Sequence, residues 1–124
     1  MSDFPRVAIV AAIRLAQIKL IWKSGKAEAH LRKRIRLGHL PGNTTLDDYE
    51  RLITTLLNSP EARVYIYEFG EIIYPTLVAT IEQRAWLVMI TMNGVMETSF
   101  PPDMPDEYLS NPSFRYMGLA GDIL

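Results

Sequence analysis

The spacing of apolar residues changes once along this chain, near residue 60. Before that point apolar residues recur at three- and four-residue intervals, as in Ile9, Ile13 and Ala16, and again in Tyr49, Ile53 and Leu56. After it come short runs rich in Val, Ile, Tyr and Phe, at 63–69, 77–81, 86–92 and 95–100. The first spacing is typical of one face of an α-helix, and the second pattern is typical of β-strands. The sequence therefore predicts an α+β fold, with N-terminal helices packed on a four-stranded antiparallel β-meander.

Turn-forming residues place the boundaries of the expected helices. The first helix runs over 5–23 and stops at Ser24-Gly25, and the second runs over 26–37 and stops at Gly38. The third begins at Thr44 or Thr45, because a threonine three residues before an aspartate is a helix N-cap pattern. In the sheet, Asn93-Gly94 is the strongest hairpin signal.

These elements predict a single domain over 1–124. Its parts are a helical half at 1–58, an antiparallel sheet at 62–102 and a tail at 103–124. The tail carries apolar and aromatic residues that we expect to pack on the core, namely Tyr108, Leu109, Phe114, Tyr116 and Leu119.

Composition restricts the class of protein further. With 48% hydrophobic and 22% charged residues, the chain is typical of a globular domain. The absence of cysteine excludes a disulfide scaffold, a thiolate metal site and a cysteine nucleophile. The apolar run at 7–13 resembles the core of a signal peptide, but it is too short to cross a bilayer and no small-residue cleavage site follows it. We therefore expect a cytoplasmic protein that does not associate with membranes.

The charges are distributed unevenly. Residues 1–42 carry nine Lys or Arg and two acidic residues, whereas 43–124 carry four Arg and twelve acidic residues. This asymmetry indicates either an anionic ligand for the first part or pairing between the two parts. A solvated basic helix would give the same pattern.

The second predicted helix places a histidine among cations. His30, Lys33 and Arg34 are three and four positions apart, so they share one side of the helix. Imidazole can transfer a proton near neutral pH, and arginine can bind and stabilise phosphate oxygens. His30 and Arg34 are therefore candidate catalytic residues, and Arg32, Lys33 and Arg36 are candidate RNA-binding residues. An exposed helix surface with a spectator histidine is the alternative.

Two strand positions extend this hypothesis. If Met96 and Phe100 face the helices, Thr98 does too, and its hydroxyl could hold a phosphate oxygen. Thr98 is thus the third candidate catalytic residue, and packing of a β-forming threonine is the alternative. Tyr67 shares a strand face with Tyr65 and Phe69 and is a candidate for stacking on RNA bases, with core packing as the alternative.

The sequence contains no motif for several other kinds of catalytic or binding site. The chain has no glycine-rich phosphate loop, no GxSxG and no HExxH. His30 and His39 are nine positions apart without an acidic cluster, which is not a metal-ligand spacing. We expect neither a metal nor a cofactor. His39 could instead supply a second imidazole beside the helix.

The order of these motifs resembles the barnase–EndoU–colicin–RelE (BECR) group of RNases, which includes bacterial toxins and phage- or secretion-associated effectors. The resemblance lies within 26–102 and rests on four segments: His30–Gly38, Asp47–Glu50, Asn93-Gly94 and Thr98–Pro102. It implies a metal-independent endoribonuclease in which the ribose 2′-hydroxyl attacks the adjacent phosphate. His30, Arg34 and Thr98 would be its catalytic residues, with Lys33 as a substitute cation. The last strand lacks the Lys or Arg that many relatives place there.

The resemblance also implies RNA and a cognate antitoxin or immunity protein as partners, and the sequence is compatible with a homo-oligomer. A non-catalytic module explains the same residues. In that hypothesis the basic helix binds nucleic acid or an acidic protein surface, and the protein is a regulatory or inhibitory partner.

Overall fold

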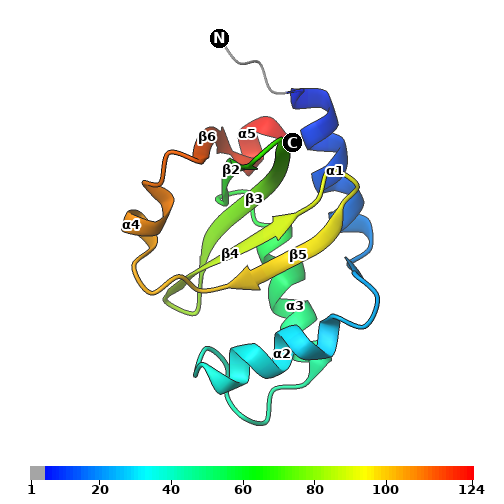
Figure 1. The fold of residues 1–124 in the computed structure, drawn as a ribbon, viewed down its shortest axis with the longest axis vertical. Helices are drawn as coiled ribbons and strands as arrows, with labels where there is room; N and C mark the ends of the chain where they lie inside the picture. The colour runs from blue at the N-terminus through cyan, green and yellow to red at the C-terminus, as the bar shows by residue number, and fades with distance from the viewer. Residues whose placement is uncertain (1–4) are drawn as a thin grey trace.

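The computed structural model describes residues 5–124, which form a helical layer against a sheet (Figure 1). α1 (Arg6–Ile18) and α3 (Leu46–Leu57) pack on one face of the sheet, and α2 (Ala27–Arg36) packs against α3. Two short helices, α4 (Pro105–Leu109) and α5 (Ala120–Ile123), lie in the C-terminal part. None of the helices formed by residues 5–124 is long and apolar enough to cross a membrane.

Over the described residues the sheet has six strands in the order β1-β5-β4-β3-β2-β6. Neighbouring strands are antiparallel, except that β1 runs parallel to β5. The strands are β1 (Ile21–Trp22), β2 (Arg63–Phe69), β3 (Ile72–Ile81), β4 (Arg84–Ile90), β5 (Val95–Phe100) and β6 (Phe114–Leu119).

The α+β class is confirmed, but the expected four-stranded meander is only the centre of a wider mixed sheet. β2 to β5 follow one another as antiparallel neighbours, and β1 and β6 extend the sheet at its two edges. The expectation of a helix over 5–23 is wrong at its end, because the backbone is extended at Lys19 and the chain continues into β1. β1 pairs with Val95 and Met96, and such a long-range partner leaves no trace in local spacing.

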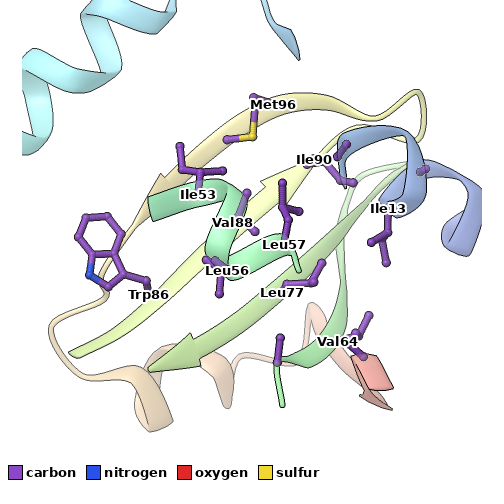
Figure 2. Packing of buried hydrophobic residues seen from close by; sticks show 14 of the residues in the cluster. Ile13, Ile53, Leu56, Leu57, Val64, Leu77, Trp86, Val88, Ile90 and Met96 are labelled. Carbon is purple, nitrogen blue, oxygen red and sulfur yellow. The ribbon is translucent and has the colours of Figure 1, made fainter. Parts of the chain in front are cut away.

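The main core lies between the sheet and α1 and α3. Figure 2 shows Ile13 of α1 and Ile53, Leu56 and Leu57 of α3 against apolar side chains of the sheet, and all four are fully buried. Their spacing along each helix is the spacing from which the helices were predicted. This core fixes the sheet face that α1 and α3 cover.

The opposite sheet face carries a smaller core. Tyr65, Val78, Leu87 and Met89 pack there with Leu109 of α4 and with Phe114. Leu109 and Phe114 are buried as expected for the tail, whereas Tyr108, Tyr116 and Leu119 remain exposed. Tyr108 nevertheless contacts Phe100 and Tyr116 contacts Tyr65, so these rings, Leu109, Phe114 and the pairing of β6 with β2 together hold the tail.

Candidate nucleic-acid interface

The outer side of α2 carries three adjacent cations. Arg32, Lys33 and Arg36, which we call the α2 ridge, are exposed. They border a surface hollow of about 590 Å³ together with Ala29 and Ile35. Lys33 and Arg36 lie in the last turn, where positive charge is favourable at the negative end of the helix dipole. Within residues 5–124 none of the three forms a salt bridge, so their charges face solvent.

Arg34 does not belong to this ridge. Its side chain points inward and is only 4% exposed, beside the buried Leu31. Its Nη1 lies 3.3 Å from Nδ1 of His39, and its guanidinium carbon lies 5.4 Å from the centre of the Phe100 ring. Its Nε is buried and has no hydrogen-bond partner in the described part of the chain, residues 5–124. The expectation that Arg34 shares one side of the helix with Lys33 is therefore wrong, because Lys33 is exposed whereas the inner side of α2, with Arg34, covers Phe100 at the end of β5.

The contact with Arg34 defines the protonation state of His39. A guanidinium can only donate hydrogen bonds, so Nδ1 of His39 must be the acceptor and the ring must be neutral. Burial, and secondly the positive charges of Arg34 and Arg84, lowers the pKa of His39 below 6.5. The imidazole thus supplies a neutral acceptor to a buried charge that has no carboxylate partner within residues 5–124.

His30 is half-buried on the side of α2 that faces β1. Its ring centre lies 5.4 Å from that of Trp22, whose Nε1 donates a hydrogen bond to Glu50. Burial lowers the pKa of His30, and the nearby charges of Arg34 and Lys33 lower it further, whereas Glu97 acts in the opposite direction. His30 is therefore neutral near pH 7 and can accept a proton.

Thr98 lies on the other side of the sheet. Met96 pairs with Ile90, and Thr98 pairs with Met89, so Glu97 is an extra residue that forms a β-bulge. Beyond the bulge the alternation is reversed. Ser99 faces α3 and accepts a hydrogen bond from Tyr49 at its carbonyl, while Thr98 shares the face of Met89. The expectation that Thr98 faces the helices is wrong because the bulge shifts the register.

Tyr67 also lies on the face away from α1 and α3. Its ring packs 4.7 Å from Phe114 and 6.5 Å from Phe69, and it belongs to the smaller core. Phe69 at the end of the strand is strongly exposed, so an aromatic surface is present there. The rings of this aromatic surface contact one another and Phe114 of β6, and they lie apart from α2.

The structure thus places His30, Arg34 and the α2 ridge on one helix, whereas Thr98 and Tyr67 lie on the sheet face away from α1 and α3. Arg34 reaches that face at Phe100, two positions from Thr98. Trp22 was missed by the sequence reasoning, because it was assigned to the end of a helix. Glu97 was missed as well, and its carboxylate lies 2.6 Å from Nζ of Lys23 in a salt bridge.

Among residues 5–124 there is no group of three or more His, Cys, Asp or Glu that could hold a metal ion. No family model, no curated protein and no solved structure matches the chain.

Proposed function

We propose that the protein binds single-stranded RNA through the α2 ridge. The observation that carries this proposal is three neighbouring cations that no acidic side chain among residues 5–124 neutralises, although the chain as a whole has a net charge of −1. Lys23 and Arg51, by contrast, each pair with a carboxylate. A row of cations along one helix attracts a phosphate backbone and releases its counterions.

The test is the salt dependence of binding. Affinity for a labelled single-stranded RNA oligomer should fall as salt rises, by about −0.7 in log–log slope for each phosphate neutralised. Replacing all three residues of the α2 ridge by Ala should flatten the slope by about 2 if each cation neutralises one phosphate.

The matched control removes the same charge from another helix. Arg6, Arg14 and Lys19 are exposed on or just after α1, and their replacement by Ala should leave most of the slope in place. An equal loss in both triple variants would mean that net charge alone attracts RNA. Binding of polyglutamate and not of RNA would instead indicate an acidic protein as the partner.

RNA cleavage is a second candidate function, supported by the half-buried neutral His30 three positions from the exposed cation Lys33. In this proposal His30 accepts the proton of the ribose 2′-hydroxyl as that oxygen attacks the phosphorus, the bond to the 5′-oxygen breaks, and the leaving 5′-oxygen takes up a proton from water. The products are a 2′,3′-cyclic phosphate and a 5′-hydroxyl end. Cleavage should proceed in excess EDTA, and His30→Ala should slow it by roughly 10²–10⁴-fold.

The substitution Thr98→Val tests whether the hydroxyl of Thr98 takes part in the proposed cleavage. The substitution keeps the shape of the side chain and removes its hydroxyl. Because Thr98 lies on the face of Met89, we expect cleavage by the Thr98→Val protein to match that of the unaltered protein. Unchanged cleavage by a folded His30→Ala protein would contradict a catalytic role for His30 and leave RNA binding alone.

A further inference from the structure

The outward side of α1 is apolar, which is unusual for a helix that covers a sheet. Its inward side buries Ile9, Ala12, Ile13 and Ala16. A second apolar row runs along the opposite side at intervals of four, four and three residues. These residues are Val7, Ala11, Leu15 and Ile18, and we call them the α1 outer stripe. A helix with one buried side normally presents polar residues on the other.

The exposure of this stripe is large. Val7 is 85% exposed, Ile18 is 82% exposed and Leu15 is 53% exposed. Isolated apolar residues on a surface are ordinary, but a continuous row along a helix marks an interaction site. The row is also fixed in place, because Leu15 lies against Gly94 in the turn between β4 and β5.

The charged residues around the α1 outer stripe indicate what charge a partner should carry. Arg14 lies on the same side of α1 as Ala11 and Ile18, which are three and four positions away. Arg6 and Lys19 flank the two ends, and α1 contains no acidic residue. A second copy packed antiparallel would bring Arg14 near its equivalent and Arg6 opposite Lys19. Such like-charge contacts disfavour self-association.

We infer that the α1 outer stripe docks an acidic amphipathic helix of a partner protein. The three- and four-residue spacing suits packing of one helix against another, and a carboxylate on the partner helix would pair with Arg14. This site is separate from the α2 ridge and does not depend on RNA binding.

The test uses two synthetic helical peptides of about 20 residues with the same Leu and Ile at heptad positions a and d. One carries Glu at the flanking positions and the other carries Lys. The Glu peptide should bind the full chain saturably and the Lys peptide should not. Ile18→Ser with Val7→Ser should weaken binding by about tenfold or more, because these side chains would be buried in the complex.

Charge reversal gives the sharper readout. Arg14→Glu should lower affinity for the Glu peptide and raise it for the Lys peptide. All these side chains are exposed, so circular dichroism and melting should be unchanged in every variant, and RNA binding through α2 should be retained.

Four results would overturn the inference. The first is no saturable binding of the Glu peptide, and the second is binding that survives Ile18→Ser with Val7→Ser. The third is dimerisation of the protein that these substitutions abolish, which would make a second copy the occupant. The fourth is binding to phosphatidylglycerol vesicles without binding to the peptide, which would make an anionic lipid surface the occupant.

Discussion

His30 and His39 are the two histidines of the chain, and both have a pKa lowered below 6.5 by burial and by Arg34. In the unfolded chain both regain an ordinary pKa, so between pH 6.5 and the lower folded values the unfolded state binds more protons. Stability is therefore present in full above pH 6.5 and is lost as pH falls through that window. Urea unfolding at about pH 7.5 and about pH 5.5 should show this loss, and His30→Gln with His39→Gln should reduce it.

The positive charge of Arg34 lowers the pKa of both imidazoles. Arg34→Met keeps a long side chain in the space beside Phe100 and removes the charge. The pKa of both His30 and His39 should rise, as followed by the C2 proton signals in NMR. Because a buried charge without a carboxylate partner is costly, the free energy of unfolding should change by no more than about 1 kcal/mol, or increase. A loss of about 3 kcal/mol or more would show that the guanidinium is needed for folding.

Gly94 is required for two reasons in the turn between β4 and β5. Its φ is +78°, and a Cβ there would lie 2.8 Å from Cβ of Leu15 and 3.0 Å from the carbonyl oxygen of Ala12. Gly94→Ala should therefore lower the free energy of unfolding by the strain of the left-handed backbone plus about 1–3 kcal/mol for the clash with α1. Gly70→Ala is the matched control, because φ is +63° there and no atom lies within 4 Å. Equal losses in thermal melts of the two variants would argue against close packing of α1 on this turn.

At the scale of the element, α3 is held at its start by a capping box. The Thr45 side chain accepts a hydrogen bond from the amide of Asp48, and the Asp48 carboxylate accepts one from the amide of Thr45. Thr45→Ala should cost about 1 kcal/mol in urea unfolding. Thr44→Ala should cost less, because its hydroxyl only donates to the carbonyl of Pro41 at an exposed site. RNA binding should be unaffected by either substitution, since neither residue lies on α2.

At the scale of the whole molecule, β6 converts β2 from an edge strand into an internal strand. The tail also forms backbone hydrogen bonds with the residues just before β2. The amide of Ala120 donates to the carbonyl of Ala62, and the amide of Gly121 donates to the carbonyl of Pro60. In the full chain all β2 amides should therefore be protected in hydrogen exchange. In a chain that ends at Ser110, every second β2 amide should exchange fast and the protein should become prone to aggregation. Slow exchange of those amides in the shortened chain would contradict the pairing of β6 with β2.

The elements that could be predicted from the sequence are those with a local cause. The helical spacing of Ile9, Ile13 and Ile53 predicted α1 and α3, the Thr45–Asp48 pattern predicted a cap, and Asn93-Gly94 predicted the hairpin between β4 and β5. These features arise from backbone preferences and from hydrogen bonds within a few residues, so local order is enough to read them.

The features that depend on partners distant in the sequence could not be predicted in this way, because they arise from the packing of the folded chain. β1 exists because Ile21 and Trp22 meet β5, and β6 exists because the tail meets β2. The bulge at Glu97 placed Thr98 on the face away from α1 and α3, and the packing of α2 over Phe100 buried Arg34 while leaving Arg32, Lys33 and Arg36 in solvent. Spacing along a helix gives only relative angles between side chains. Which side faces inward depends on the surface that the helix covers, and that surface comes from residues more than sixty positions away.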